Sequence, residues 1–363
     1  MKKPIYVTSP TLTNLDCYVE SLKNIWETGV LTHNGPYVQS LEKELCSTLG
    51  LENFVSVVNG TFALQMAIKA LEIKGEIITT PFSWVATVSA IKWEGCTPIF
   101  CDIDPETFNI DPSKLESLIT DRTVAIMPVH VFGNPCDVES IKKIADKHGL
   151  KVIYDAAHAV GTTLNGASVL LHGDVSAVSL HATKIFNTGE GGGCITKDNL
   201  LHEKLKRIRF FGHDDNKDVV EDGLNAKMTE VHAALGLANL QSFASVLKDR
   251  MEKYSYYKEQ LSLVSNKLSF QKLSDVGCNY SYFPVVFESE DVLLQVSKAL
   301  EESNIFARRY FYPSLNLYEK IVHPQGCPKS EDLSKRILCL PLYYMISEDI
   351  QDDVVTIIKD TLL

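Results

Sequence analysis

One lysine, Lys184, stands in a setting that suits a nucleophilic amine. It follows the apolar run 175–180, and it lies between a turn that contains Ser179 and the glycine-rich segment 189–193. Burial lowers the pKa of a lysine because it disfavours the charged form, and the neutral amine can attack a carbonyl carbon. Taken alone, Lys184 has the alternative interpretation of a surface lysine in a glycine-rich loop.

A carboxylate, Asp155, ends another apolar segment, 151–154. Ligands of α/β proteins bind at the carboxyl ends of the strands. A carboxylate at that position can keep a ring nitrogen protonated, and the small residues Ala156 and Ala157 leave room for a flat ring. Taken alone, Asp155 is better explained as the N-cap of a following helix.

A third feature is the strand-to-helix junction Asn59-Gly60-Thr61. The free N–H groups and the dipole of a helix N-terminus attract phosphate, and a glycine lets a ligand come close. An ordinary N-cap is the alternative. The junction matches neither GxGxxG nor a Walker A motif, so a dinucleotide or nucleoside triphosphate site has no support. A Schiff-base lysine, a carboxylate for a pyridinium nitrogen and a phosphate site together predict a site for pyridoxal phosphate.

The elements that must position these residues alternate between strands and helices over the first two-thirds of the chain. We expect strands at 54–58, 76–80, 98–103, 124–131, 151–154, 175–180 and 193–196. We expect helices between them at 60–73, 85–93 and 138–148. Buried strands that alternate with helices predict an α/β fold, with a largely parallel sheet covered by helices on both faces.

The pattern changes near residue 240. A long helix is expected at 241–263, with Arg250, Lys253 and Lys258 exposed. A strand at 282–287 and helices at 291–303 and 349–362 follow it. We therefore expect a large cofactor-binding domain over 1–240 and a smaller α+β domain over 241–363.

The composition excludes several classes of protein. The 363 residues carry 35 Lys+Arg against 46 Asp+Glu, a net charge of −11, whereas a nucleic-acid-binding protein normally shows a basic excess. The basic run 204–209 is expected to be the solvated face of a helix.

No apolar stretch is long enough to span a membrane and no signal-peptide core is present, so a cytoplasmic location is expected. The nine cysteines and ten histidines form no CxxC or HExxH motif. No metal site is therefore expected, and the cysteines are expected to be small buried residues.

Three motifs in the same order are typical of one enzyme family. They are Asp155-Ala156-Ala157-His158, then His181-Ala182-Thr183-Lys184 with Gly189-Glu190-Gly191-Gly192, and Gly223-Leu224-Asn225-Ala226-Lys227-Met228-Thr229-Glu230. From Leu31 to Pro341 the chain resembles the pyridoxal phosphate-dependent sugar-nucleotide aminotransferases of the DegT/StrS type. The resemblance implies the fold-type I aminotransferase architecture, in which a smaller α+β C-terminal domain follows the domain of the mostly parallel central sheet.

The resemblance also implies roles for individual residues. Lys184 would be bonded to pyridoxal 5'-phosphate and would then move protons, and Asp155 would hold the pyridine nitrogen protonated. The other cofactor contacts would come from Gly60, Thr61 and Ser179 at the phosphate, Trp84 stacked on the ring, His158 near the ring hydroxyl, and Asn225 at the phosphate of the partner's cofactor in a homodimer with shared active sites. His158 stands where the family often has Gln, and it keeps the hydrogen-bonding capacity. A dehydratase branch has His in place of the lysine, so Lys184 favours amino transfer.

The resemblance implies L-glutamate as the amino donor and C4 of dTDP-4-keto-6-deoxy-D-glucose as the acceptor. The product would be dTDP-4-amino-4,6-dideoxyglucose, used in surface-glycan biosynthesis. Transfer to C3 of a dTDP-3-keto-6-deoxyhexose is the alternative, and no residue type in the sequence decides between the two.

The candidates for holding the substrate's pyrophosphate are His33, Arg308, Arg309 and Tyr310, although solvated surface arginines are an equally simple interpretation. A non-catalytic regulatory or binding protein on the same fold is the alternative from another class, and it predicts the loss of Lys184, Asp155 or the phosphate groups.

Overall fold

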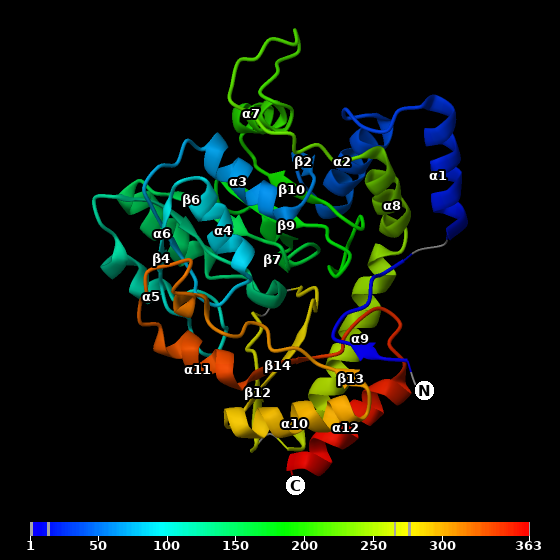
Figure 1. Cartoon of the computed structure of the whole chain (residues 1–363), viewed down its shortest axis with the longest axis vertical. Coiled ribbons are helices and arrows are strands. Elements are labelled where there is room, and N and C mark those ends of the chain that lie inside the picture. Colours follow the sequence, from blue (N-terminus) through cyan, green and yellow to red (C-terminus); the bar gives the residue numbers. More distant parts are fainter. Residues whose placement is uncertain (1–2, 13–14, 265, 275–276, 363) are drawn as a thin grey trace.

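A seven-stranded sheet forms the centre of the larger part of the molecule (Figure 1). The computed structural model describes residues 3–12, 15–264, 266–274 and 277–362. The strand order is β2-β10-β9-β6-β5-β3-β4, with β10 antiparallel to both neighbours and the other pairs parallel. The strands are β2 (Phe54–Val57), β3 (Glu76–Thr79), β4 (Thr97–Phe100), β5 (Thr123–Met127), β6 (Lys151–Asp155), β9 (Val175–Ser179) and β10 (Gly192–Ile195). The expected mostly parallel sheet is therefore confirmed.

Helices cover both faces of this sheet. Successive strand residues point to opposite faces, and accordingly Ile77 and Ile78 belong to different core clusters. The cluster on one face joins the sheet to α3 (Gly60–Ala70), α4 (Val85–Trp93) and α7 (Asn199–Arg209). The other face packs against α2 (Pro36–Leu49), α6 (Val138–His148) and α8 (Glu230–Leu240). Because both faces are buried, the strands are apolar runs without a polar side.

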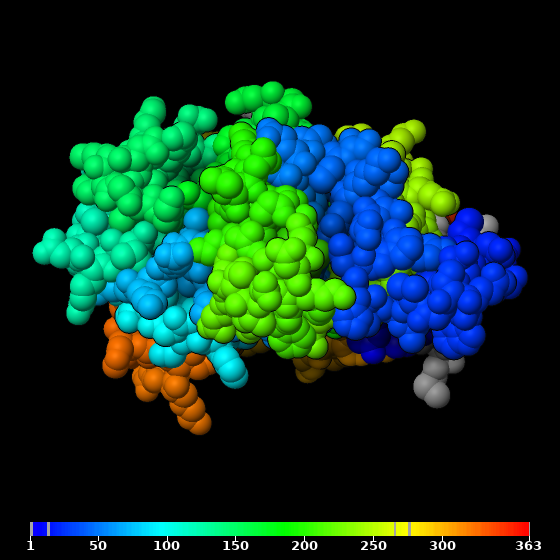
Figure 2. Space-filling model, turned by 90° about the horizontal axis from the view of Figure 1, so that it is seen from above, coloured from blue at the N-terminus to red at the C-terminus, as the bar shows by residue number. Residues whose placement is uncertain are grey.

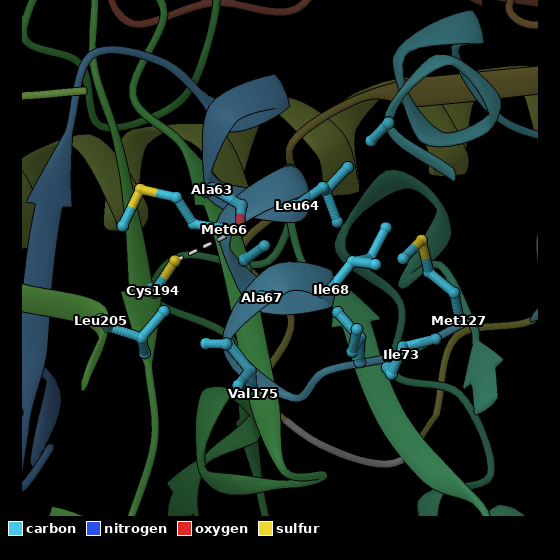
Figure 3. Packing of buried hydrophobic residues seen from close by; sticks show 14 of the residues in the cluster. Ala63, Leu64, Met66, Ala67, Ile68, Ile73, Met127, Val175, Cys194 and Leu205 are labelled. Atoms are coloured by element: carbon cyan, nitrogen blue, oxygen red, sulfur yellow. Dashed lines mark hydrogen bonds between the residues drawn. The ribbon is translucent and has the colours of Figure 1, made fainter. Parts of the chain in front are cut away.

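The contact between α3 and the sheet is shown in Figure 3. Ala63, Leu64, Ala67 and Ile68 of α3 lie among core residues of the neighbouring elements, and all four are buried. The Cys194 thiol on β10 donates a hydrogen bond to the Ala63 carbonyl at 3.3 Å. This packing fixes the N-terminus of α3 beside the carboxyl end of β9.

The C-terminal part is built on a second, smaller sheet. Its three antiparallel strands run in the order β11 (Leu268–Phe270), β12 (Phe283–Phe287) and β14 (Ile337–Leu340). Four helices surround it: α9 (Phe243–Ser262), α10 (Glu290–Glu302), α11 (Pro328–Arg336) and α12 (Glu348–Leu362). The N-terminal strand β1 (Ile5–Tyr6) pairs in parallel with β13 (Ile305–Phe306). We propose a domain boundary near residue 240, with β1 attached to the smaller domain through this pairing.

Several elements were not among those expected. The helix α1 (Leu15–Thr28) packs against α8, and α2 precedes β2. The short elements α5 (Pro112–Leu115), β7 (Thr163–Leu164) and β8 (Ala167–Ser168) connect the larger ones. Strand β14 was also missed, because it ends directly before Pro341 and is defined by its pairing with β12, which lies far back in the sequence. Among the described residues, no helix has the length and apolar character that crossing a bilayer requires.

Two arginines expected at the surface are buried. Arg250 on α9 is 4% exposed and donates hydrogen bonds to the carbonyls of Tyr280, Ser281 and Leu342. Arg209, in the basic run on α7, is also 4% exposed and pairs with Glu42 at 2.5 Å. A guanidinium has five donors, so it can satisfy several buried acceptors at once. Helical periodicity shows which residues share a face, but not whether another segment covers that face.

The two lysines of α9 and the nine cysteines differ in how far they are exposed. Lys258 is exposed as expected, whereas Lys253 is half-buried. All nine cysteines are free thiols; the interpretation as small buried residues is confirmed for seven of them, whereas Cys17 is exposed and Cys46 is only partly buried.

Candidate active site

A cavity of about 420 Å³ lies at the carboxyl ends of β6 and β9. Both the large sheet and the C-terminal part contribute to its wall. Nine of the predicted site residues line it: Gly60, Thr61, Trp84, Asp155, His158, Ser179, Lys184, Arg308 and Tyr310. The carboxyl edge of the sheet is where α/β folds place their ligands, so the cavity is the candidate active site.

Asp155 is the last residue of β6 and is almost completely buried. Its Oδ2 accepts a hydrogen bond from the Thr87 hydroxyl at 2.6 Å, and its Oδ1 accepts one from the Ala157 N–H at 3.2 Å. Burial holds the pKa of Asp155 above its usual value, although these two hydrogen bonds and the charge of Lys184 act in the opposite direction. A positively charged group that enters the cavity can pair with this carboxylate and favour its ionised form.

Lys184 lies in the turn that follows β9 and lines the cavity. Burial lowers its pKa to about 8, although the Asp155 carboxylate acts in the opposite direction. At mildly alkaline pH, near 8, about half of this amine is therefore uncharged. A neutral amine on a cavity wall can attack a carbonyl group and can also carry a proton.

The start of α3 and the end of β9 form a narrow polar corner. The Asn59 side chain caps α3 by accepting the Phe62 N–H at 2.9 Å. A Cβ on Gly60 would lie 2.9 Å from the Ser179 Cβ, and a Cβ on Gly192 would lie 2.4 Å from the Asn59 carbonyl carbon. Only glycine allows this close approach of three backbone segments. The free N–H groups of Gly60 and Thr61, with the Ser179 hydroxyl beside them, suit a phosphate.

His158 is held among aromatic rings on the cavity wall. Its ring is nearly parallel to those of Phe132 and Phe311, at centroid distances of 6.1 and 6.0 Å. Burial, with the charge of Lys184, holds the pKa of His158 well below its usual value. Its Nδ1 accepts the Phe132 N–H at 3.3 Å, so the neutral ring carries its proton on Nε2. His158 can thus donate one hydrogen bond from Nε2.

Trp84, Arg308 and Tyr310 form a group of stacked side chains on the cavity wall. The Arg308 guanidinium lies 5.7 Å from the centre of the Trp84 ring and 4.8 Å from that of Tyr310. The two aromatic rings meet edge to face at 6.5 Å. Trp84 is 52% exposed, so its indole is not a core residue. An arginine held in this way leaves its remaining donors for an anionic ligand.

Three of the predicted residues do not line the cavity. Arg309 pairs with Glu290 at 2.5 Å, donates to the Lys335 carbonyl at 3.0 Å, and lies over the Tyr312 ring. Adjacent arginines thus have different roles, since Arg308 faces the cavity and Arg309 faces α10.

His33 and Asn225 lie elsewhere in the same chain. His33 lines a second cavity of about 220 Å³, together with Phe210 and Lys227. The Asn225 side chain accepts a hydrogen bond from Lys227. Figure 2 shows the segment that follows α7, drawn in light green, on the face beside the blue N-terminal helices. Neither residue reaches the first cavity within one subunit.

The prediction from sequence missed several residues that line the first cavity or support it. Tyr282 and Phe311 line it, and Thr87 holds Asp155 from the first turn of α4. Thr87 lies only three residues after Trp84, which was a candidate. No local signal distinguished it from an ordinary buried threonine, because its partner is 68 residues away in the sequence.

The residues of the cavity fit pyridoxal phosphate. The corner at Gly60 and Ser179 would accept the phosphate, and a side chain at position 60 would fill it. The buried Asp155 carboxylate would accept the N–H of the ring nitrogen, the Lys184 amine would bond to the aldehyde carbon, and the His158 Nε2–H would donate to the ring hydroxyl. Each of the chemical groups of the cofactor therefore has a suitable partner among these side chains.

Comparisons with known proteins agree with this description. The sequence model of the DegT/DnrJ/EryC1/StrS aminotransferase family matches residues 16–359. The chain is 43% identical over 369 residues to the dTDP-4-amino-4,6-dideoxy-D-glucose transaminase of Shigella dysenteriae, which covers 99% of this chain and 100% of that protein. It is 39% identical over 360 residues to the protein of the same name from Escherichia coli, with 96% of each chain covered.

Solved structures with a similar fold include one in the presence of a TDP-sugar product and one with a bound cofactor. The structure of DesI in the presence of its TDP-sugar product has a TM-score of 0.93 and 30% identity, covering 100% of this chain and 94% of that one. NtdA from Bacillus subtilis, solved with bound cofactor PMP, has a TM-score of 0.89 and 28% identity, covering 96% and 82% of the two chains.

Proposed function

Since the chain belongs to the DegT/DnrJ/EryC1/StrS aminotransferase family, we propose that it transfers an amino group from L-glutamate to C4 of dTDP-4-keto-6-deoxy-D-glucose. The product is dTDP-4-amino-4,6-dideoxyglucose. The chain is a sugar-nucleotide aminotransferase with the fold-type I architecture, and it uses pyridoxal phosphate. The observation that carries the proposal is one cavity that joins Lys184, Asp155 and the polar corner at Gly60. The names of the two full-length relatives support the choice of sugar and of carbon atom.

Each residue of the cavity has a defined task in this reaction. Bound pyridoxal phosphate withdraws electrons from the carbon next to the nitrogen, so that a proton can leave it. We propose that the Lys184 amine takes this proton from the α-carbon of glutamate. The amine would pass this proton to the cofactor carbon, and in the second half of the reaction it would move a proton from that carbon to C4 of the sugar. Asp155 keeps the ring nitrogen protonated, and the Trp84 indole stacks on the ring.

The nucleotide part of the substrate needs cationic partners despite the acidic net charge. We propose that Arg308 binds the pyrophosphate, with Tyr310 beside it, because both line the cavity and the guanidinium is held against two rings. Arg309 is a weaker candidate because Glu290 already binds it. The two adjacent residues thus provide a matched comparison.

We propose that the enzyme is a homodimer with shared active sites. His33, Asn225 and Lys227 lie on a surface outside the subunit's own cavity. In the proposed dimer, Asn225 reaches the cofactor phosphate of the partner subunit, as the family resemblance implies. The same resemblance leads us to propose a cytoplasmic enzyme whose product enters surface-glycan biosynthesis.

The test is to identify the carbon that receives nitrogen. The purified holoenzyme is incubated with L-glutamate and either the 4-keto or the 3-keto dTDP-6-deoxyhexose, and the product is analysed by NMR, with Lys184→Ala as the control. Nitrogen on C4 supports the proposal. Nitrogen on C3 of the 3-keto sugar alone would replace it with the C3 alternative. A protein that binds the cofactor but aminates neither sugar would favour another acceptor, and one that binds no cofactor would favour the regulatory alternative.

A further inference from the structure

A chain of buried hydroxyl groups leads from α4 to the Asp155 carboxylate. The Thr87 Oγ1 lies 2.6 Å from Asp155 Oδ2, and the Ser83 Oγ lies 2.8 Å from Thr87 Oγ1. Thr87 is fully buried, and Ser83 and Asp155 are 3% and 5% exposed. Ser83 and Asp155 line the cavity, whereas Thr87 is not among its lining residues, so the Thr87 hydroxyl reaches Asp155 from the protein interior.

The chemistry of the three groups fixes the direction of the hydrogen bonds. An ionised carboxylate has no proton to give, so the Thr87 hydroxyl must donate to Asp155. The Thr87 oxygen is then free to accept, and the Ser83 hydroxyl can donate to it. The resulting order, Ser83 to Thr87 to Asp155, directs both O–H dipoles toward the carboxylate. This arrangement stabilises the ionised form of Asp155 relative to its protonated form.

The same hydrogen bond determines how the carboxylate is oriented. Thr87 holds Oδ2, and the Ala157 N–H holds Oδ1 at 3.2 Å. With one donor on each oxygen, the carboxylate group is held at two points and cannot rotate freely. Lone pairs remain on both oxygens for a further donor in the cavity.

We propose that Thr87 is a positioning residue, which holds the Asp155 carboxylate ionised and oriented so that it retains the proton on the ring nitrogen of pyridoxal phosphate. This inference rests on the proposed function, because it assigns Asp155 to that nitrogen. It adds a residue that touches neither the cofactor nor the substrate, and Ser83 is the supporting donor behind it.

The matched variants are Thr87→Val, which keeps the shape and removes the hydroxyl, and Thr87→Ser, which keeps the hydroxyl. Thr87→Ala is a second variant without the hydroxyl, in case valine disturbs the folding of α4. The variants are loaded with pyridoxal phosphate labelled with ¹⁵N in the ring, and the ¹⁵N chemical shift reports whether the nitrogen is protonated. The rate of the half-reaction with glutamate and the apparent Kd for glutamate are measured in parallel.

We expect the ¹⁵N shift of Thr87→Val and Thr87→Ala to move toward the value of an unprotonated pyridine. The half-reaction should slow by about tenfold or more, while the Kd for glutamate changes by less than about twofold. Thr87→Ser should keep the shift of the unaltered enzyme. A purely structural role for Thr87 would lower thermal stability without moving the ¹⁵N shift.

An unchanged shift in both variants without the hydroxyl, with the nitrogen of the unaltered enzyme protonated, would overturn the inference and leave the proposed function intact. If the unaltered enzyme binds the cofactor with an unprotonated ring nitrogen, Asp155 does not protonate that nitrogen. The inference about Thr87 would then be overturned as well. The acceptor sugar is tested separately by NMR of the product. If the proposed 4-keto sugar is not aminated, the ¹⁵N comparison between the Thr87 variants still stands.

Discussion

A Cβ on Gly60 would lie 2.9 Å from the Ser179 Cβ, so the N-terminus of α3 and the end of β9 approach as closely as a glycine allows. This contact places the first N–H groups of α3 beside the Ser179 hydroxyl. The position has no positive φ, so the need for glycine comes from space and not from backbone conformation. The proposed phosphate site therefore depends on the absence of a single side chain.

Gly60→Ala is expected to weaken the binding of pyridoxal phosphate by about tenfold or more, since the added methyl group pushes α3 away from Ser179. A fluorescence titration of the apoenzyme with the cofactor measures this effect. Gly326→Ala is the control, because no atom lies within 4 Å of the position its methyl group would take. Equal affinity in the two variants would show that the phosphate lies elsewhere.

The reaction of Lys184 with the cofactor should depend on pH. Burial lowers the pKa of Lys184 from 10.5 to about 8, and only the neutral amine attacks the aldehyde. The rate at which the apoenzyme binds pyridoxal phosphate should therefore rise with pH and reach half of its maximum near 8. Stopped-flow absorbance measures the rate, and the same cofactor with a free lysine derivative corrects for its own titration.

Asp155→Asn should shift this midpoint downward, because the carboxylate of Asp155 raises the pKa of Lys184. A corrected midpoint above about 10 in the unaltered enzyme would contradict the burial of the amine.

We expect Arg308→Ala to impair substrate binding and Arg309→Ala to lower stability instead. The first is expected to raise the KM for the nucleotide sugar by about tenfold, because an anion loses a charged partner. The second should leave KM within about twofold and lower the free energy of unfolding by about 1 kcal/mol, since it removes the partly buried pair with Glu290. Steady-state kinetics and denaturant unfolding of both variants test this, and the reverse pattern would move the substrate site to Arg309.

Arg250→Met is expected to destabilise the chain by about 3 kcal/mol, because two buried carbonyl groups and one partly buried carbonyl group lose their donor. Lys258→Met on the same helix is the control, since Lys258 is exposed. Denaturant unfolding followed by circular dichroism measures both. Equal stability of the two variants would mean that water replaces the guanidinium.

Two inactive variants should complement each other if the active sites are shared. Lys184→Ala lacks the reactive amine, and Asn225→Ala lacks the proposed contact with the partner subunit's cofactor. In a mixed dimer, one of the two sites contains both intact residues, so a 1:1 mixture after exchange of subunits should recover about a quarter of full activity. Recovery of no activity, with mixed dimers detected by mass spectrometry, would place Asn225 outside the shared site.

Local sequence patterns predicted much of the large domain. The helices 85–93 and 138–148 have the predicted bounds, and all seven strands of the large sheet lie within a few residues of their predicted positions. These elements are recognisable because long apolar runs and helical periodicity express burial within one segment. The missed strand β14 and the buried Arg250 depend on segments far away in the chain, which no local pattern reports.

The sequence by itself determined which chemistry the chain can perform. A lysine after a buried strand, an aspartate at the end of another and a glycine at the start of a helix specify the cofactor through residue type and local context. The tertiary structure alone decided that Thr87 holds Asp155 and that Arg308 faces the cavity while Arg309 binds Glu290. The physical reason is that residue type and short-range periodicity determine the local elements, whereas the neighbours of a side chain depend on how elements distant in sequence pack against one another.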